Sequence, residues 1–252
     1  MTVHLERDGA LFVVTLDRPE ARNAIDNATA AAVSAAMDTL DADDDLRVGV
    51  ITGAGGTFCA GMDLKASLRG ELPFTKERGF AGVTGTPPRK PLIAAIEGYA
   101  LAGGTEIALH CDLVVAASDA SFGLPEVKRS LVAAAGGLFL LGSTLPRQVA
   151  MELALLGEHV PAARMAALGL VNRVVEPGSA LRVALELARA VAANAPLAVA
   201  ATKEILVRAG DWTRAQSVQE QLAIYGPVFA SADAVEGRRA FAEKRPAVWR
   251  NR

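Results

Sequence analysis

The sequence predicts an α/β fold, because short apolar strands alternate with helices through its first half. An alanine-rich helix is expected at 27–41, followed by a buried strand at 48–53. The same order returns as a strand at 91–98, a short helix at 103–110 and a strand at 112–117. This rhythm is typical of α/β units. Hydrophobic residues make up 51% of the 252 positions, which is enough for a substantial core.

The first strands form a predicted hairpin. Residues 3–7 and 10–16 are short strand-like segments, and Asp8-Gly9 between them is a hairpin turn signal. Further along, residues 66–90 contain several glycines and prolines. We expect a mobile loop there, with at most short helical pieces, placed where it could cover a ligand.

The second half is predicted to be mostly helical. One strand is expected at 171–175, and helices are expected at about 137–142, 146–156, 161–168, 178–194, 196–209, 211–225 and 233–243. Terminal helices of this kind either dock onto a neighbouring subunit or pack back on their own core. We divide the chain into an α/β core, 1–195, and a C-terminal helical region, 196–252, with no linker between them.

Composition and charge disfavour several classes of protein. The net charge is -2 and the pI is near 6.0, so there is no overall positive field for nucleic acid. The N-terminus lacks the apolar segment of a secretory signal, and no apolar run approaches the roughly 20 residues of a membrane span. We therefore expect a cytoplasmic protein that binds neither nucleic acid nor membrane. Cys59 and Cys111 are expected to be small buried hydrophobes, and the three scattered histidines indicate no metal site.

Two glutamates are prominent because each follows a turn of small residues. Glu106 follows Ala102-Gly103-Gly104-Thr105, and Glu126 follows Phe122-Gly123-Leu124-Pro125. Two carboxylates at one site can divide general acid and general base work between them. Each is also an ordinary residue for the first turn of a helix, where a negative charge is favourable. The pattern alone leaves both interpretations open.

Two turns that leave predicted strands are rich in glycine. The first runs from Gly53 to Leu64 and lacks the lysine of a phosphate loop. An amide near Met62, freed by Gly61, and the amide of Gly103 at a helix start are candidate donors to an oxyanion. The alternative is that these glycines only permit close packing.

Five motifs in order carry a family resemblance. They occupy residues 18–24, 58–64, 98–106, 122–126 and 241–246. With them the chain resembles the enoyl-CoA hydratase/isomerase (crotonase) family from its first hairpin to its last helix. The resemblance implies a core of repeated β-β-α units, with C-terminal helices that assemble trimers, often paired into hexamers. It also implies an acyl-CoA thioester substrate and no separate cofactor, since CoA is part of the substrate.

The resemblance implies roles for the two turns and the two glutamates. The backbone amides of Met62 and Gly103 are expected to polarise the thioester carbonyl. Glu106 matches the residue that activates water for attack at C3, and Glu126 matches the one that delivers a proton to C2. Many relatives with other chemistries lack one of these carboxylates. We therefore expect an enoyl-CoA hydratase of fatty-acid or related acyl-CoA breakdown.

The resemblance also implies contacts with the CoA moiety. The adenine is expected beside the segment Ala60-Gly61-Met62-Asp63-Leu64, with Lys65 as a candidate for binding phosphate. Phe241 and Lys244 are candidates for reaching the CoA of an adjacent subunit, although a solvated helix end is the alternative for Lys244. The other candidate substrate-binding residues are Ala21, Arg22 and Gly104, of which Arg22 occupies a position that is often apolar in relatives.

Departures from the family pattern leave other reactions open. Where many fatty-acid hydratases resemble Gly-x-x-Pro-Gly-x-Gly-Gly, residues 130–137 read Ser-Leu-Val-Ala-Ala-Ala-Gly-Gly, which predicts a different acyl-pocket floor. Glu126-Val127-Lys128 is similar to carnitinyl-CoA dehydratase-like members. The alternatives are therefore such a dehydratase, an enoyl-CoA isomerase, or a non-catalytic acyl-CoA-binding protein. Specificity is expected to reside in 66–90 and 130–135.

Overall fold

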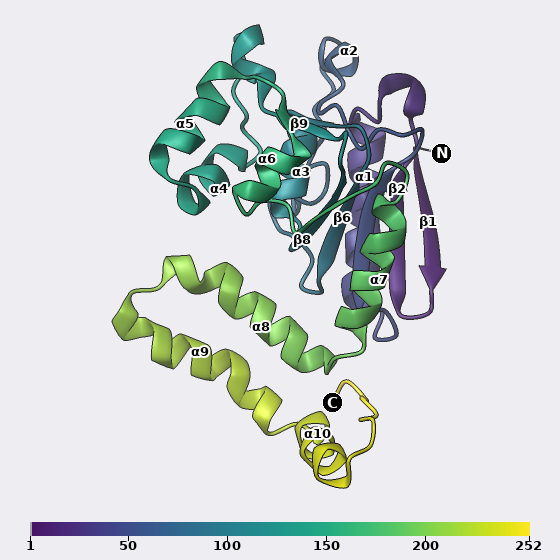
Figure 1. The fold of residues 1–252 in the computed structure, drawn as a ribbon, viewed down its shortest axis with the longest axis vertical. Helices are drawn as coiled ribbons and strands as arrows, with labels where there is room; N and C mark the ends of the chain where they lie inside the picture. The colour runs from purple at the N-terminus through teal and green to yellow at the C-terminus, as the bar shows by residue number, and fades with distance from the viewer. Residues whose placement is uncertain (1) are drawn as a thin grey trace.

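A six-stranded sheet forms the centre of the α/β part of the molecule (Figure 1). In the computed structural model, which describes residues 2–252, its strands run in the spatial order β1 (Val3–Asp8), β2 (Leu11–Leu16), β3 (Val48–Gly53), β6 (Leu92–Ile96), β8 (Leu113–Ala117) and β11 (Arg173–Val175). β1 and β2 form the predicted antiparallel hairpin, and every other neighbouring pair is parallel. The predicted α/β class is confirmed.

The two faces of this sheet are covered by different helices. In β3, Val48 and Val50 belong to the core cluster that contains α7 (Ala180–Ala192), whereas Ile51 belongs to the cluster that contains α1 (Asn27–Ala42). This division follows from the two-residue period of a strand. Both faces are buried, which explains why the strand reads as a continuous apolar run.

A second, smaller sheet lies at one end of the first. It consists of β7 (Tyr99–Leu101), β9 (Ser121–Gly123) and β10 (Val160–Pro161), with β7 and β9 parallel. Cys59 extends it through an isolated parallel bridge to Ala100. These strands were not predicted from the sequence, because two or three residues are too few to show an alternating pattern.

The small sheet reveals the repeated unit of the fold. β6 and β7 are followed by α3 (Gly103–His110), and β8 and β9 are followed by the 3-10 helix η2 (Pro125–Arg129). β3 and the Cys59 bridge are likewise followed by α2 (Leu64–Ser67). Each unit places one strand in the large sheet, a short strand in the small sheet, and then a helical turn. This is the β-β-α repeat that the family resemblance implied.

The segment 66–90 differs from the predicted mobile loop in its second half. It contains a small hairpin, β4 (Phe74–Thr75) and β5 (Gly79–Phe80), and Phe80 and Val83 are buried in the main core. The guanidinium of Arg78 is buried and pairs with Asp38 and Asp41 of α1. This half therefore contains a hairpin where at most short helical pieces were expected, and apolar packing and the ion pairs of Arg78 hold it against α1.

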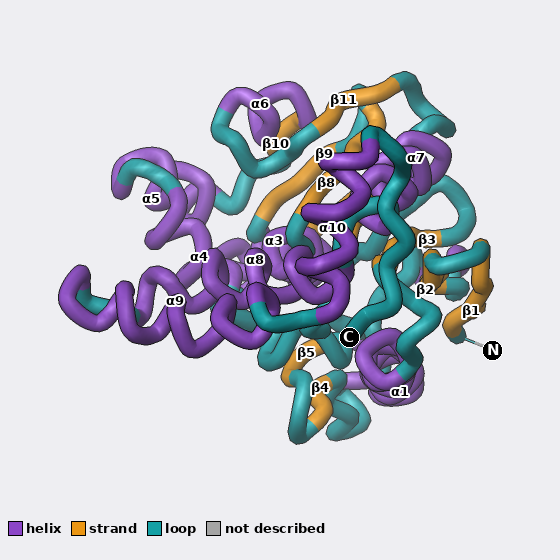
Figure 2. Tube along the Cα trace, turned by 90° about the horizontal axis from the view of Figure 1, so that it is seen from below, coloured by secondary structure: helices purple, strands orange, loops and turns teal. Residues whose placement is uncertain are grey.

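The remaining helices divide between two regions (Figures 1 and 2). Three flank the small sheet: α4 (Gly137–Thr144), α5 (Arg147–Leu156) and α6 (Ala162–Ala167). Three extend away from the large sheet: α8 (Pro196–Arg208), α9 (Arg214–Phe229) and α10 (Ala232–Glu243). Two further 3-10 turns are η1 (Pro19–Ala21) and η3 (Ala209–Asp211). The helical second half is as predicted.

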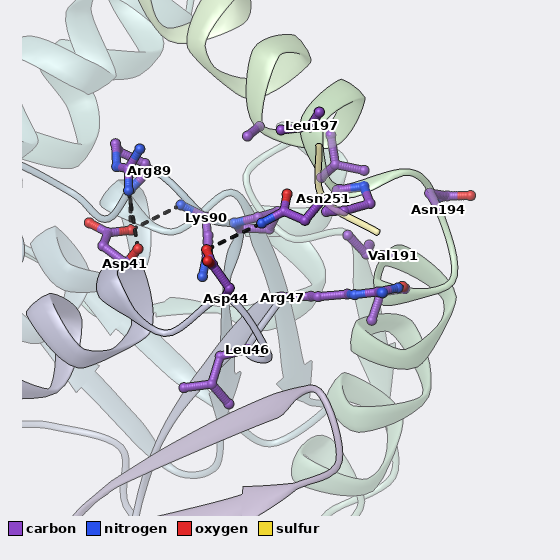
Figure 3. Close-up of a pocket in the computed structure, with 15 residues that line it drawn as sticks. Asp41, Asp44, Leu46, Arg47, Arg89, Lys90, Val191, Asn194, Leu197 and Asn251 are labelled. Carbon is purple, nitrogen blue, oxygen red and sulfur yellow. Dashed lines mark hydrogen bonds between the residues drawn. The ribbon is translucent and has the colours of Figure 1, made fainter. Parts of the chain in front are cut away.

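A small cavity of about 140 Å³ marks the junction between the core and these terminal helices (Figure 3). The backbone amides of Arg89 and Lys90 donate to the Asp41 carboxylate, and the side-chain amide of Asn251 donates to Asp44. Nearby, the indole N–H of Trp249 donates to the carbonyl of Ala193, between α7 and α8. The end of the chain thus returns to the core.

Candidate active site

Three turns meet at one edge of the small sheet. In the parallel register, Leu101 lies opposite Gly123, and Cys59 bridges to Ala100. Parallel strands end at the same edge, so the segments that follow them start side by side. These segments carry Gly61-Met62, Ala102-Gly103 and Pro125-Glu126. The small sheet therefore juxtaposes residues that lie far apart in the sequence.

The amides of Met62 and Gly103 lie where the first two turns touch. A Cβ placed on Gly61 would lie 3.0 Å from the nitrogen of Gly103 and 2.8 Å from the Cβ of Ala102. Gly61 also has φ +93°, a conformation that favours glycine. Among residues 2–252, neither the Met62 nor the Gly103 amide donates to a protein acceptor. Two neighbouring free N–H groups can stabilise an oxyanion.

Thr105 connects the helix that carries Glu106 to the strand that leads to Glu126. Its buried hydroxyl lies 2.6 Å from the carbonyl oxygen of Ala100 and 2.9 Å from that of Gly123, and it accepts the N–H of Gly123. The N–H of Ala102 also donates to the Gly123 carbonyl. These bonds fix the start of α3 relative to the end of β9.

Glu106 is held by the beginning of another helix. Its side chain is 3% exposed, and Oε1 accepts hydrogen bonds from the amides of Ala135 (2.8 Å) and Gly137 (3.0 Å). Burial raises the pKa of Glu106, and these two N–H donors oppose that rise. The carboxylate therefore keeps one orientation while it remains able to take up a proton.

Glu126 has a different environment, in the first turn of η2. Its Oε2 is buried and has no hydrogen-bond partner among the described residues. Burial, with a further contribution from the negative charge of Glu106, raises the pKa of Glu126 to about 7. A carboxyl group with this pKa is substantially protonated at neutral pH and can act as an acid.

The raised pKa of Glu126 predicts a pH-dependent effect on stability. Because the folded pKa of about 7 exceeds the usual 4.5, the folded state binds this proton more tightly than the unfolded chain. That contribution is complete below pH 4.5 and is lost as the pH rises through 7. We expect Glu126→Gln to be more stable than the wild type at pH 8 by about 1–3 kcal/mol, with the difference vanishing toward pH 4.5. Urea unfolding at several pH values measures it.

Glu158→Gln provides a control of opposite sign. The pKa of Glu158 is lowered, because its carboxylate accepts a hydrogen bond from the Lys128 ammonium group. Removing this carboxylate should lower stability above pH 4.5, by a small amount because the pair is exposed. A stability difference for Glu126→Gln that stays constant between pH 4.5 and 8 would contradict the proposed environment of Glu126.

A cavity of about 590 Å³ connects both carboxylates and both turns. This volume is typical of a small-molecule site. Its wall is largely apolar, with a few charged side chains, and is formed by Arg22, Ala60, Met62, Leu64, Leu72, Phe74, Phe80, Leu101, Ala102, Gly103, Glu106, Pro125, Glu126, Lys128, Arg129, Leu131, Val132, Ala134, Ala135, Gly157 and His159. Both segments expected to determine specificity contribute to it.

The other candidate binding residues lie outside this lining. Ala21, Gly61, Lys65 and Gly104 do not line the cavity, although Gly61 and Gly104 shape its turns: a Cβ on Gly104 would lie 2.2 Å from the Cys59 carbonyl oxygen. Phe241 and Lys244 are on or at the end of α10 and do not line it either. Their expected contact is with an adjacent subunit and stays a prediction.

Asp63 has a structural role and does not line the cavity. Burial raises its pKa, but hydrogen bonds from the Ala66 amide and the Arg18 guanidinium outweigh that effect, so the pKa falls below its usual value. Its carboxylate caps α2 and pairs with Arg18 at 2.9 Å. Its charge is therefore already neutralised within the chain.

Polar groups that were not predicted from the sequence hold the connection that leads to Met62. Asn23 is 1% exposed; its Oδ1 accepts the amide of Arg18, and its Nδ2 donates to the carbonyls of Ala54 and Thr57. Asn23 and Arg18 both belong to the first family motif, 18–24, and that motif was the signal by which they could have been found. Neither the burial of Asn23 nor its bonds to Ala54 and Thr57 follow from that motif, since those two partners lie 31 and 34 positions away.

The two cysteines differ in how deeply they are buried. Cys59 is fully buried, as expected, whereas Cys111 is half-buried.

Within residues 2–252, no group of three or more metal-ligating side chains is close enough to hold a metal ion. In the same part of the chain, no single helix is long and apolar enough to cross a membrane; α7 and the segment Pro196–Asp211 satisfy the criteria only as a pair bent by 108°.

Comparison with known proteins agrees with this fold. A family model described as enoyl-CoA hydratase/isomerase matches residues 6–252. Carnitinyl-CoA dehydratase of Salmonella typhi is 43% identical over 263 residues, covering 100% of this chain and 99% of that protein. Enoyl-CoA hydratase EchA1 of Mycobacterium marinum is 52% identical with a TM-score of 0.97, and carnitinyl-CoA hydratase of Mycobacterium avium is 44% identical with a TM-score of 0.79; each covers 100% of this chain and 99% of its own.

The fold and the comparisons define a crotonase-type enzyme of the lyase class, a hydratase or dehydratase. The chain belongs to the enoyl-CoA hydratase/isomerase family. The family resemblance of the sequence motifs is confirmed over almost the whole chain.

Proposed function

We propose that this protein is an enoyl-CoA hydratase that adds water reversibly across the 2,3 double bond of a trans-2-enoyl-CoA. The observation that carries the proposal is the arrangement of Glu106 and Glu126 in one cavity beside the free amides of Met62 and Gly103. Family membership supports an acyl-CoA thioester as the substrate. No cofactor beyond the CoA of the substrate enters the proposal.

Each step of a hydration can be assigned to one of these groups. The thioester oxygen accepts hydrogen bonds from the Met62 and Gly103 amides, which stabilise the enolate-like charge as it develops. Glu106 takes a proton from the water that attacks C3, and Glu126 donates its proton to C2. The product is a 3-hydroxyacyl-CoA. One proton enters Glu106 and one leaves Glu126, so exchange of one proton with solvent restores the enzyme.

The environments of the two glutamates support this division of roles. Glu106 accepts two amide N–H bonds, which favour its charged form and suit a general base. Glu126 lacks such a partner on Oε2, and its pKa of about 7 suits a general acid. Double-bond isomerisation can be carried out by one group that moves a proton between two carbons, so it gives less reason for a second carboxylate in the cavity.

The second candidate is dehydration of carnitinyl-CoA, because proteins of that name are among the relatives. Its acyl tail carries a quaternary ammonium group. The cavity wall contains the cationic side chains of Arg22, Lys128 and Arg129, and its carboxylates are Glu106 and Glu126. A permanent cation is disfavoured near this wall, so we place an uncharged enoyl chain first.

A substrate panel tests the proposal. Purified enzyme is assayed with crotonyl-CoA, longer trans-2-enoyl-CoAs, carnitinyl-CoA and a 3-enoyl-CoA, following the absorbance of the conjugated thioester. We expect the highest kcat/KM with an uncharged trans-2-enoyl-CoA. Preferred turnover of carnitinyl-CoA or of the 3-enoyl-CoA would replace the proposal with the corresponding alternative. CoA binding without turnover of any member would indicate a non-catalytic binding protein.

We also propose that the protein is a homotrimer or a hexamer assembled through its terminal helices. The exposed apolar residues of α8, α9 and α10 support this: Leu206, Val207, Val218, Leu222, Phe229 and Phe241 are 53–88% exposed in the single chain. Such surfaces on a monomer indicate an interface. In such an assembly, Phe241 and Lys244 would be candidates to reach the CoA of a neighbouring subunit. Light scattering coupled to size exclusion measures the mass, and a monomer at micromolar concentration would contradict the proposal.

A further inference from the structure

His110 is the last residue of α3, the helix that carries Glu106. Its Nδ1 is 2.7 Å from the main-chain carbonyl oxygen of Glu106. A carbonyl oxygen only accepts, so Nδ1 carries the proton in this contact. Burial lowers the pKa of His110, which keeps the ring neutral at physiological pH. The imidazole therefore has one tautomer and one orientation.

The other edge of the imidazole supports the segment that binds the Glu106 carboxylate. A Cβ on Gly136 would lie 2.8 Å from Cε1 and 2.9 Å from Nε2 of His110, so the ring occupies the space beside this glycine. Gly136 has φ +96° and stands between the two residues whose amides donate to Glu106, Ala135 and Gly137. The imidazole therefore occupies the position that a side chain at residue 136 would take.

We infer that His110 is a positioning residue that, through Gly136, holds the Ala135 and Gly137 amides against the Glu106 carboxylate. The imidazole bonds to the backbone of Glu106 at one edge and contacts Gly136 at the other, so it sets the distance between the base and its two donors. Nothing in the proposed reaction requires His110 to touch the substrate, and it does not line the cavity. This inference rests on the proposed role of Glu106.

The charged surroundings of Glu106 make its pKa a usable readout. The same cavity is lined by Glu126, Lys128 and Arg129 of η2, and by Arg22 and His159. The helix that begins at Gly137 contains no charged residue, and α3 carries no titratable group besides Glu106 and His110. The amides of Gly137 and Ala135 lower the pKa of Glu106. Weakening these two hydrogen bonds should therefore raise the pKa of Glu106.

The test compares His110→Ala with Cys111→Ala, a neighbouring truncation at the end of α3 that is outside the cavity. We expect His110→Ala to lower kcat about 10- to 100-fold with little change in KM. The acid limb of the kcat/KM profile should move upward by about one pH unit. Cys111→Ala should leave kcat and the acid limb of the kcat/KM profile unchanged. Equal behaviour of the two variants would overturn the inference.

A second variant keeps the result interpretable if His110→Ala folds poorly. His110→Asn retains a short donor in place of Nδ1–H and should recover part of kcat. Gly136→Ala adds a methyl group against the imidazole and should lower kcat by itself, but less so in the His110→Ala background, where the space is free. Additive effects of the two substitutions would mean that the ring and Gly136 do not act together.

A measurement without substrate separates this inference from the proposed function. Carbon-13 NMR titration of labelled glutamate side chains, assigned with Glu106→Gln, gives the pKa of Glu106 in the resting enzyme. A rise in His110→Ala supports the positioning role even if the enzyme turns over none of the enoyl-CoAs tested. An unchanged Glu106 pKa overturns the role even if hydratase activity is found.

Discussion

Replacing Glu106 with Gln is expected to lower kcat for enoyl-CoA hydration at least about 100-fold, since the side chain can no longer take up the proton of water. Gln keeps an oxygen that can accept the amides of Ala135 and Gly137, which now bind Oε1. The fold should therefore survive. Steady-state kinetics with crotonyl-CoA, alongside thermal unfolding of the same sample, measures both effects.

Glu97→Gln is the matched control for this substitution. Its carboxylate also accepts two backbone amides, those of Gly178 and Ala180 at the start of α7, but it lies outside the cavity. We expect this change to affect stability and to leave kcat within about twofold of the wild type. If Glu106→Gln kept more than a tenth of the wild-type kcat, Glu106 would not be the base.

Adding one methyl group at Gly61 is expected to lower kcat about 10²- to 10³-fold, the typical effect of losing one oxyanion donor. A Cβ there would lie 2.8 Å from the Cβ of Ala102 and 3.0 Å from the Gly103 nitrogen, so the two turns would have to shift and the two amides would move apart. KM for the CoA substrate should rise less than kcat falls, because the amide bonds strengthen as the charge develops. Stopped-flow absorbance with crotonyl-CoA measures the two parameters.

Gly56→Ala separates the steric effect at Gly61 from backbone strain. Gly56 also has a positive φ, +72°, and lies on the same connection after β3, yet a Cβ there meets no atom within 4 Å. Both variants carry the strain of a non-glycine residue at positive φ, but only the Gly61 variant crowds the Gly103 turn. Equal losses of kcat in the two variants would show that strain is the cause.

The local patterns predicted the large elements of the fold well. The apolar run at 48–53 is β3, and the alanine-rich segment from residue 27 is α1 (Asn27–Ala42). These elements bury enough side chains for their period to appear in the sequence. The three-residue strands β7 and β9 were missed, although they bring the site together. Their identity depends on pairing with each other, which no local pattern contains.

The same distinction holds for the candidate site. The sequence indicated Glu106, Glu126 and the two glycine turns, because glycine before a helix start and a paired carboxylate are local signals. It did not indicate that Ala135 and Gly137 would bind the Glu106 carboxylate; residues 130–137 were read as the floor of the acyl pocket. Nor did it indicate that Phe80 of the expected loop would be buried and line the cavity, or that Arg78 would pair with Asp41 of α1.

The sequence by itself determined the α/β class, the family and the residue types that can carry the reaction. The tertiary structure alone decided which of them meet. The Met62 turn, the Gly103 turn and Glu126 converge because three short parallel segments end at one edge of the small sheet. It also gave the two glutamates different environments, since burial acts on both but the amides of Ala135 and Gly137 act on Glu106. Burial and pairing arise between distant segments, so they follow from the folded chain and from no single motif.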